Sequence, residues 1–455
     1  MVRLLQYSDI ENVYDDPDRL ARFAGRLRQL SGPDSIVVGT GDNTAPGVTS
    51  MVSQGRQALE LFEAIDVELS TFGNHDFDYG LKATKSIVAD SPQTWVNTNV
   101  YNGTGELFAT EAGAVPTACR QIGATTIGFV GLTDPATPSL NPMAADLTID
   151  DPIEAARNAV ADLERNGAEQ VVALSHLGSL DDRLARSTDV DVILGGHIHS
   201  PRIDRLDGTV LTRPGVNGHR VLELSFDGAD WQVTEHEIDG VDPYAPLARA
   251  VRDRISAAGL DEVVGHVEEP LSRDPSIVHG GECRIGNFVA DAYRWAADAD
   301  VGIQNSGGIR PGPPLAGEVT IADFVSVIPF EEPVVTVELT GDELRRAFVS
   351  LRDPPVDFGE DGWWHGHVSN AEIVWDEEAG QLRAARVGGE PIDSNRTYTV
   401  ATSEYLLHSE HELPAVDTHH RRDEHEIQHE ALAEYARKRG IDPEIEGRIR
   451  TYDRS

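Results

Sequence analysis

Apolar and polar positions along the first half of the chain alternate between two periods. Short runs of β-branched and aliphatic residues indicate buried strands, and longer segments with apolar residues three or four positions apart indicate amphipathic helices. The predicted strands cover residues 4–8, 35–39, 67–70, 125–132, 170–174, 190–194, 210–213, 221–226 and 231–238. The predicted helices cover residues 18–30, 49–64 and 152–166. This alternation predicts an α/β sandwich with a mixed sheet.

The pattern breaks near residues 241–246, where two prolines precede a helix over residues 247–258 that Gly259 closes. We therefore predict a first domain over residues 1–240, a linker helix within 241–260, and a second domain over 261–455. The second domain is predicted to mix helices and strands and to end in a charged tail. Its predicted elements cover residues 286–297, 321–326, 341–351 and 427–439 (helices) and 301–304, 334–339 and 398–402 (strands).

The charge of the chain is strongly negative. It has 455 residues, with 77 Asp and Glu against 38 Lys and Arg, which gives a formal net charge of −39. Disorder is disfavoured because the apolar periodicity continues to the end of the chain, and the acidic residues are dispersed rather than grouped in one block. We interpret the charge as the surface of a halophile's protein, because at about 1 M salt the screening length is roughly 3 Å. A nucleic-acid duplex is an unsuitable partner, since no basic stripe is present to neutralise phosphates.

Cysteine usage and the N-terminal segment restrict the class further. Cys119 and Cys283 are the only two cysteines and lie far apart, which excludes a disulfide framework and a cysteine-based zinc site. The chain begins with a predicted strand, not a signal peptide, and no apolar run approaches the 18 or so residues of a membrane span. These features predict a cytoplasmic protein without a membrane contact. They leave its oligomeric state open.

Polar residues with metal-binding side chains follow five of the predicted strands. Open α/β sheets place their sites at the carboxyl ends of strands, so these side chains are expected to meet. The set is Asp9, Glu11, Asp42, Asn74, His75, His176, His197 and His199. Mixed carboxylate and imidazole ligands suit two divalent ions such as Mn, Zn, Fe or Co, with Mn favoured, and one carboxylate can bridge the pair. Asp42 is the candidate bridge.

The loop between residues 71 and 80 is the most informative stretch. Adjacent His75 and Asp76 predict an imidazole that is aimed at a substrate and held by a carboxylate. Each feature also has a simpler interpretation: an Asn/Asp/Gly turn here, a turn at the strand end for His197 and His199, and a capping or core histidine for His176. The recurrence of the strand-then-ligand arrangement favours the metal site.

These motifs resemble those of a known family. The first half is similar to the calcineurin-like metallophosphoesterases in Gly41-Asp42, Gly73-Asn-His-Asp76 and Gly196-His-Ile-His199. The second half resembles the C-terminal domain of 5′-nucleotidases, UDP-sugar hydrolases and 2′,3′-cyclic phosphodiesterases in Glu282-Cys-Arg-Ile-Gly286, Asn305-Ser-Gly-Gly-Ile-Arg310 and Ile328-Pro-Phe330. The resemblance implies an αββα metallophosphoesterase sandwich, a linker helix and a second α+β domain.

The resemblance also implies roles for individual residues. Asp9, Asp42 and His199 would hold one metal ion, and Asp42, Asn74, His176 and His197 the other. His75, oriented by Asp76, would stabilise the transition state or assist the leaving group. The implied substrate contacts are Arg284 and Arg310 for phosphate, Asn305 for phosphate or base, Phe330 and Tyr405 for stacking on the base, and His411 near the sugar or base. A hydroxide between the metals would attack phosphorus in the cleft between the two domains.

Three departures from the family pattern keep alternatives open. Glu11 stands where the family has His. It would either shift the preference of the site toward Mn or Fe, weaken binding of the first metal ion, or not be a ligand at all. Ser306 replaces a Gly, and residues 405–413 replace a Gly-rich loop. For Arg284 and Arg310, surface ion pairing is the alternative. The leading prediction is a 5′-nucleotidase-type phosphohydrolase. The rivals are a 2′,3′-cyclic phosphodiesterase, a nucleotide-sugar hydrolase, an enzyme for another phosphorylated or sulfur-bearing small molecule, and a non-catalytic nucleotide-binding protein.

Overall fold

The computed structural model describes residues 2–352, 362–409 and 412–452. The chain forms two compact units, Met1–Ala258 (unit 1) and Gly259–Ser455 (unit 2). Among the described residues, no helix combines the length and the apolar character that crossing a bilayer requires.

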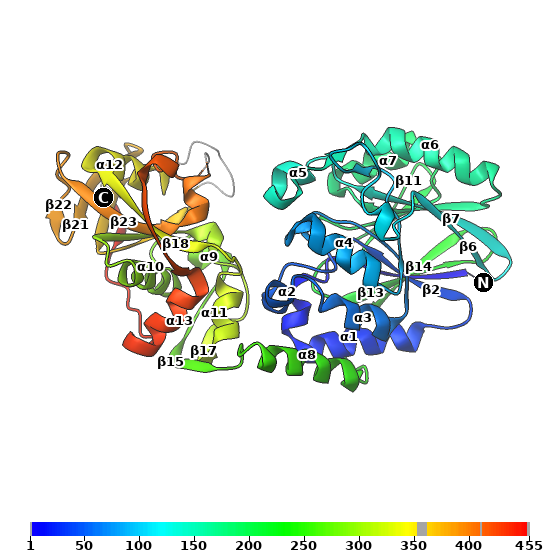
Figure 1. Cartoon of the computed structure of the whole chain (residues 1–455), viewed down its shortest axis with the longest axis horizontal. Coiled ribbons are helices and arrows are strands. Elements are labelled where there is room, and N and C mark those ends of the chain that lie inside the picture. The colour runs from blue at the N-terminus through cyan, green and yellow to red at the C-terminus, as the bar shows by residue number, and fades with distance from the viewer. Residues whose placement is uncertain (1, 353–361, 410–411, 453–455) are drawn as a thin grey trace. The chain divides into compact units, whose positions relative to one another are not determined.

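Unit 1 is built around two six-stranded mixed sheets (Figure 1). The first has the order β14 (Trp231–Glu237), β13 (Arg220–Phe226), β1 (Val2–Tyr7), β2 (Ser35–Thr40), β3 (Val67–Thr71), β4 (Thr94–Trp95). The second has the order β11 (Arg202–Leu206), β12 (Thr209–Arg213), β10 (Val192–Gly195), β9 (Gln170–His176), β7 (Thr125–Thr133), β6 (Thr117–Ile122). Strands β1 to β4 run parallel, as do β12, β10, β9 and β7, so each sheet gathers its carboxyl ends at one edge.

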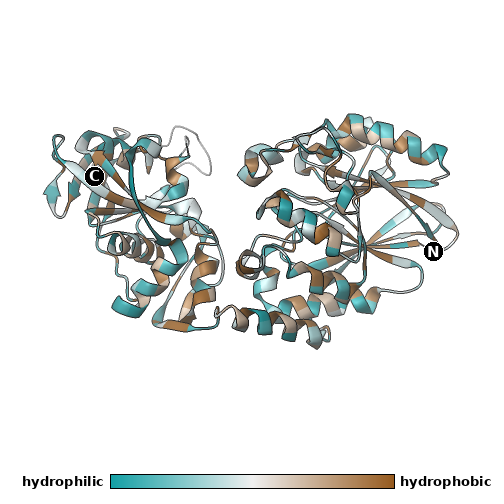
Figure 2. Cartoon of the chain, viewed as in Figure 1, coloured by the Kyte–Doolittle hydropathy of each residue, from teal (hydrophilic) through white to brown (hydrophobic). Residues whose placement is uncertain are grey.

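Helices cover the outer face of each sheet. The first sheet is covered by α1 (Pro17–Leu30) and α3 (Ala58–Ile65), with α8 (Ala245–Ala257) packed on these helices, and the second by α6 (Pro152–Arg165) and α7 (Asp181–Ser187). Shorter elements connect them: α2 (Val48–Ser53), α4 (Gly80–Asp90), α5 (Thr137–Leu140), β5 (Val100–Tyr101) and β8 (Thr148–Ile149). Apolar residues such as Val38, Leu69 and Val172 fill the space between the two sheets. The strands are accordingly rich in brown, hydrophobic segments in Figure 2. The predicted αββα sandwich is confirmed.

One predicted helix of unit 1 is wrong. The segment 49–64 forms two helices, α2 and α3, instead of one. Gln54 and Gly55 between them have φ of +52° and +81°, which lie in the left-handed region and cannot continue a right-handed helix.

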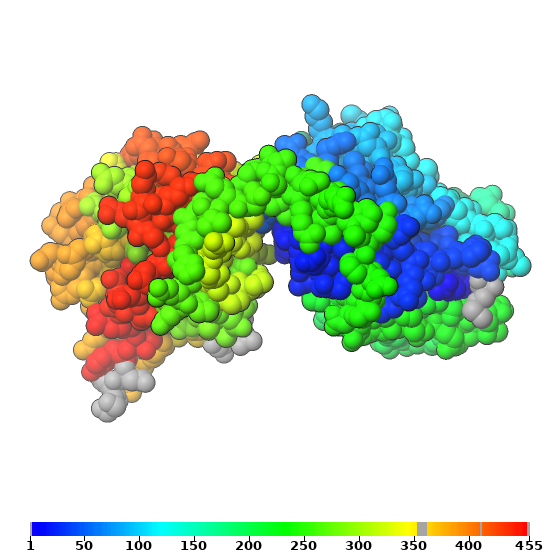
Figure 3. Space-filling model, turned by 90° about the horizontal axis from the view of Figure 1, so that it is seen from below, coloured from blue at the N-terminus to red at the C-terminus, as the bar shows by residue number. Residues whose placement is uncertain are grey.

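Helix α8, in the region expected to link two domains, packs against unit 1. Its buried Leu247 and Val251 join the same apolar cluster as Leu20 and Phe23 of α1. The backbone N–H of Tyr244, just before the helix, donates to the carbonyl of Ala21 at 2.8 Å. Figure 3 shows this green segment lying on the blue N-terminal one.

Unit 2 is a mixed α+β structure, as predicted. Its central sheet has the order β19 (Gly366–Ser369), β16 (Val301–Asn305), β23 (Thr397–Ser403), β18 (Pro333–Thr340), β24 (Arg421–Ile427). Two smaller sheets have the orders β22 (Glu390–Pro391), β21 (Gln381–Val387), β20 (Ala371–Asp376), β25 (Ile449–Tyr452) and β15 (Val263–Leu271), β17 (Leu315–Thr320). Its helices are α9 (Pro275–Val278), α10 (Arg284–Ala296), α11 (Ile321–Val327), α12 (Gly341–Ser350) and α13 (Gln428–Arg439).

A fully buried histidine lies in the core of unit 2. His367 in β19 is 0% exposed, and its Nε2 is 3.3 Å from the hydroxyl oxygen of Ser306. Position 286 requires glycine, since a Cβ there would lie 2.2 Å from the Cγ of His367. Burial lowers the pKa of His367 to about 3, because an imidazolium would be removed from water at this position.

We expect His367 to make unit 2 sensitive to acid. A histidine in the unfolded chain has a pKa of about 6.5. Between that pH and about 3, the unfolded chain therefore binds one more proton at His367 than the folded chain does. Stability should therefore fall as the pH is lowered through this window, by up to about 1.4 kcal/mol per pH unit. Denaturant unfolding of wild type and His367→Gln between pH 4 and 7.5 checks this: the variant should show the shallower slope. His419→Gln, whose side chain is 91% exposed, is the control and should retain the wild-type slope. Parallel slopes for wild type and His367→Gln would contradict the prediction.

Candidate metal centre and substrate-binding residues

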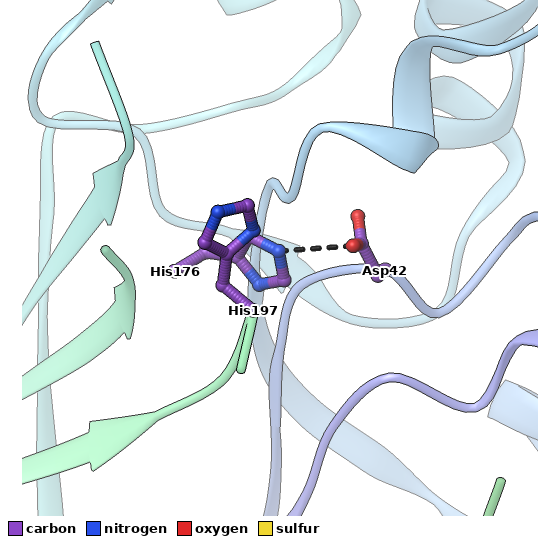
Figure 4. A group of neighbouring side chains, drawn as sticks. All are labelled: Asp42, His176 and His197. Atoms are coloured by element: carbon purple, nitrogen blue, oxygen red, sulfur yellow. Dashed lines mark hydrogen bonds and ion pairs between the residues drawn. The ribbon is translucent and has the colours of Figure 1, made fainter. Parts of the chain in front are cut away.

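The predicted ligands of unit 1 meet at the carboxyl ends of β1, β2, β3, β9 and β10. They form two groups, and within each group one possible ligand atom per residue lies within 4.8 Å of the others. The groups are Asp42, His176 and His197 (Figure 4), and Asp9, Glu11 and His199. The two groups contain every predicted metal ligand except Asn74. The predicted ligands are Asp9, Glu11, Asp42, Asn74, His176, His197 and His199.

Asn74 has an unsatisfied acceptor. Its side chain is 8% exposed, and its Oδ1 is buried without a hydrogen-bond partner among the described residues. Leaving such a carbonyl oxygen unpaired costs about 1–3 kcal/mol. A cation coordinated by this oxygen would remove that cost, so the donor set fits a divalent metal centre.

A hydrogen bond to the backbone fixes the orientation of the His176 ring. Its Nδ1 lies 2.8 Å from the carbonyl oxygen of Thr40, and because a carbonyl oxygen only accepts hydrogen bonds, Nδ1 must carry a proton. Its Nε2 lies 3.0 Å from the Oδ2 of Asp42. This hydrogen bond fixes the tautomer and leaves Nε2 as the atom available to a metal. Gly41 makes the arrangement possible, because a Cβ there would lie 2.3 Å from the Nδ1 of His176.

Four candidate ligands have left-handed backbone conformations. The φ angles of Asp9, Glu11, Asp42 and His197 are +49°, +42°, +52° and +71°. Non-glycine residues held in this region cost of the order of 1–3 kcal/mol each and cluster at functional sites. Four of the eleven non-glycine residues with positive φ in the described part of the chain are thus candidate ligands, which supports a functional role for these loops.

The electrostatics of the cluster favour bound cations. Burial raises the pKa of Asp9 to about 7. Burial disfavours the charged forms of Asp42 and His176 as well, but their mutual attraction outweighs it, so that the pKa of Asp42 stays below its usual range and that of His176 rises to about 10. The proton on His176 therefore neutralises the Asp42 carboxylate, as a bound metal ion would.

The carboxylate beside His75 is Asp78, not Asp76 as predicted. The Nδ1 of His75 lies 2.9 Å from the Oδ2 of Asp78, which directly follows the 3-10 turn His75–Phe77. Burial disfavours the imidazolium, but Asp42 and Asp78 outweigh it and raise the pKa of His75 to about 10. Its side chain is 36% exposed, so the ring can reach a substrate.

Asp76 instead connects two loops. Its carboxylate accepts five hydrogen bonds, from the N–H groups of Gly73, Asp42, Asn43 and Thr44 and from the hydroxyl of Thr44. The Asp42 carboxylate in turn accepts from the N–H of His75 at 2.7 Å. Asp76 therefore positions the Asp42 loop relative to the His75 loop.

Three further residues of the centre escaped prediction. Asp78 could have been found from its i,i+3 spacing to His75. Asn141 donates to the Asn74 carbonyl at 2.8 Å and to Asp78 at 2.9 Å, and Asp134 lies 3.6 Å from the Nε2 of His197. These two lie in loops between β7 and β8, and no local pattern connects them to the motifs.

In unit 2, strand directions bring the predicted substrate residues to one sheet edge. Strands β16 and β23 run parallel, and β18 runs antiparallel to β23 with Val334 opposite Ser403. The segments after β16, before β18 and after β23 therefore lie at the same edge. They carry Asn305 to Arg310, Phe330 and Tyr405.

The two arginines have different surroundings. Arg284 donates to the carbonyls of Pro443 at 2.8 Å and Glu269 at 3.2 Å, and it forms an ion pair with the Glu269 carboxylate at 3.5 Å, which favours the ion-pairing alternative. Arg310 is exposed, and its side chain forms no ion pair with any residue that the structure describes. Asn305 is buried, and its Oδ1 accepts from the side chain of Gln304.

Phe330 and Tyr405 are the two aromatic residues among the exposed large apolar side chains of the described chain, at 37% and 44%. Two exposed rings at one sheet edge can stack on a planar ligand. The Tyr405 hydroxyl donates to Glu412 at 3.1 Å. His411 lies outside the described residues.

Comparison with known proteins identifies both units. Residues 2–201 match the family described as calcineurin-like phosphoesterase, and residues 263–418 match the family described as 5′-nucleotidase, C-terminal domain. The chain belongs to the metallophosphoesterases that carry a 5′-nucleotidase C-terminal domain, a class of hydrolytic enzymes.

Individual relatives are distant. The chain is 24% identical to "Endonuclease YhcR" of Bacillus subtilis over 82% of this chain and 33% of that protein, and 23% identical to "Trifunctional nucleotide phosphoesterase protein YfkN" of the same organism over 98% and 34%. It thus spans about a third of the length of these two relatives. The fold matches that of a 5′-nucleotidase precursor from Thermus thermophilus with a TM-score of 0.75 and 21% identity, over 100% of both chains.

We expect Asp76 and Asp78 to differ in what their loss affects. Asp76→Asn should lower the free energy of unfolding by about 2–4 kcal/mol, because one amide oxygen replaces two charged acceptors and an NH2 group then faces buried donors. Asp78→Asn should change stability by less than about 1 kcal/mol and should lower the pKa of His75, because one of its two carboxylates is lost. Denaturant unfolding and NMR titration of the imidazole check both. Equal destabilisation by the two variants would contradict the separation of roles.

Proposed function

We propose that the chain hydrolyses a nucleotide phosphoester with the help of two divalent metal ions. The observation that carries this proposal is the buried Asn74 oxygen without a partner among the described residues, beside two ligand groups at the carboxyl ends of strands from both sheets. Asp9, Asp42 and His199 would hold one ion, with Glu11 as a further ligand. Asp42, Asn74, His176 and His197 would hold the other, so that Asp42 is shared. The ions would be Mn, Zn, Fe or Co.

When bound, two such ions supply Lewis acidity and make a water molecule acidic enough to attack phosphorus. The chain's own groups complete the chemistry. His75 is partly exposed, and its Nδ1 lies 2.9 Å from the Asp78 carboxylate, which favours a protonated ring that can donate to a phosphoryl or leaving-group oxygen. Asp78 accepts from Nδ1, which leaves the Nε2 proton for the substrate.

A nucleotide is the substrate that the surface of unit 2 supports. Phe330 and Tyr405 offer exposed rings for stacking on a base, and the exposed Arg310 offers a planar guanidinium for phosphate oxygens. We propose that both units contact the substrate during turnover. The names of the relatives, which include a trifunctional nucleotide phosphoesterase, support this substrate class.

The second candidate is a 2′,3′-cyclic phosphodiesterase or nucleotide-sugar hydrolase with the same metal centre. The segment after Tyr405 favours this second candidate. Residues 405–413 replace the family's Gly-rich loop, and here the Tyr405 hydroxyl donates to the Glu412 carboxylate. A carboxylate at that position would disfavour a free phosphate monoester nearby and would accept hydrogen bonds from sugar hydroxyls.

The test is release of phosphate from AMP in high salt after chelator treatment, with and without added Mn²⁺. We expect release that depends on the metal and an Asp42→Ala variant slower by at least about a hundredfold, since even residues behind metal ligands give effects of this size. Asp189→Ala, an exposed acidic residue of unit 1, is the matched control and should retain wild-type activity.

Inactivity of wild type toward AMP, cyclic nucleotides and nucleotide sugars, with metal shown to be bound, would overturn the proposed activity and favour a binding protein. Activity toward cyclic nucleotides or nucleotide sugars alone would select the second candidate.

A further inference from the structure

The two ligand groups of unit 1 differ in composition. One group offers two carboxylates and one imidazole, from Asp9, Glu11 and His199. The other offers one carboxylate and two imidazoles, from Asp42, His176 and His197, next to the Asn74 amide oxygen. Carboxylates suit hard ions such as Mn²⁺, whereas imidazole suits Zn²⁺ and other later metals. Glu11 is the residue that creates this difference.

The fold holds the Glu11 side chain in place; it is not a flexible side chain on the surface. It is 5% exposed, has φ of +42°, and begins the 3-10 turn Glu11–Asp15. The turn is anchored at its other end, where the Asp15 carboxylate accepts from the N–H groups of Val48 and Thr49, both at 2.7 Å. The Oε1 of Glu11 forms an ion pair with the Nε2 of His199 at 3.0 Å, and the two atoms are close enough to bind one ion.

The imidazoles of the other group are equally constrained. The rings of His176 and His197 pack edge to face with centroids 5.0 Å apart. His176 directs Nδ1 to the Thr40 carbonyl, and the N–H of His197 donates to the Asp9 carboxylate at 3.1 Å. Because Glu11, His176 and His197 are held by the fold, the difference in donor atoms between the two groups is retained when metal binds.

We propose that the metal centre is chemically asymmetric and that Glu11 makes its position the less zinc-selective of the two. The proposal rests on the two-metal centre of the proposed function. Zn²⁺ binds more tightly than Mn²⁺ at most sites with nitrogen and oxygen ligands. The preference for Zn²⁺ over Mn²⁺ is nevertheless smaller at the position of Asp9, Glu11 and His199, where three of the four donors are carboxylates once the shared Asp42 is counted. In a mixture of metals, the centre therefore holds two different ions.

The experiment follows displacement of Mn²⁺ by Zn²⁺ in the full chain, without substrate. The protein is loaded with two equivalents of Mn²⁺ and titrated with Zn²⁺, while bound metals are counted by mass spectrometry and Mn²⁺ by electron paramagnetic resonance. Wild type should lose its Mn²⁺ in two steps separated by at least about tenfold in free Zn²⁺, and the intermediate should show uncoupled Mn²⁺. Glu11→His should move the second step to at least about tenfold lower Zn²⁺.

Two further variants make the result specific. Glu164→His, an exposed position on α6, makes the same change in charge and should follow wild type. Glu11→Gln keeps the side-chain length and should weaken binding of one Mn²⁺ at least about tenfold while leaving the other unchanged. Circular dichroism confirms that each variant is folded.

A single displacement step in wild type, an unchanged second step in Glu11→His, or failure of wild type to bind two Mn²⁺ would overturn the proposal. The readout involves no hydrolysis, so failure of the proposed activity is distinguishable. A protein inert toward nucleotides that still shows two steps would retain the asymmetric centre.

Discussion

Carboxylates that are almost entirely removed from water impose the main constraint on unit 1. Asp9 and Asp42 are 1% and 2% exposed, and they follow neighbouring parallel strands. Burying a charge costs several kcal/mol unless opposite charge and hydrogen bonds compensate. The backbone N–H groups of His75 and His197 and the imidazole of His176 supply part of the compensation, and bound cations would supply more. The sandwich provides this environment because parallel strands bring their carboxyl ends, and the loops that follow, to one edge.

The same constraint explains why glycine is needed in these loops. A Cβ on Gly73 would lie 2.2 Å from the Oδ1 of Asp42, so that the loop after β3 can approach the loop after β2 only with glycine there. Asp76 then fixes the approach by accepting N–H groups from both loops. Backbone geometry thereby determines where the ligand atoms of Asp42 and Asn74 lie, before any metal binds.

The parts of the structure that could be predicted are those encoded locally. Apolar periodicity indicated the central strands of both sheets in unit 1, and residues that follow those strands indicated the candidate ligands. The edge strands β6 and β11 were missed because their burial is low and their alternation weak. The carboxyl-terminal segment was expected to be a charged tail, yet Ile449 pairs with Ile373 in β25 and β20, a contact between residues far apart in sequence. The partner of His75 was misassigned because adjacency in sequence was taken for adjacency in space, whereas a 3-10 turn places residue i+3 beside residue i.

The two units place their candidate functional residues under different constraints. The candidate metal ligands in unit 1 are mostly buried and held by backbone hydrogen bonds, because coordination requires ligand atoms at fixed positions. Phe330, Tyr405 and Arg310 in unit 2 are exposed and lie on segments beyond the strand ends, where replacement costs little stability. The fold therefore restricts the class of reaction far more strongly than the identity of the substrate. A sequence can retain all the metal ligands and still change its base or sugar preference through a loop such as the one after Tyr405.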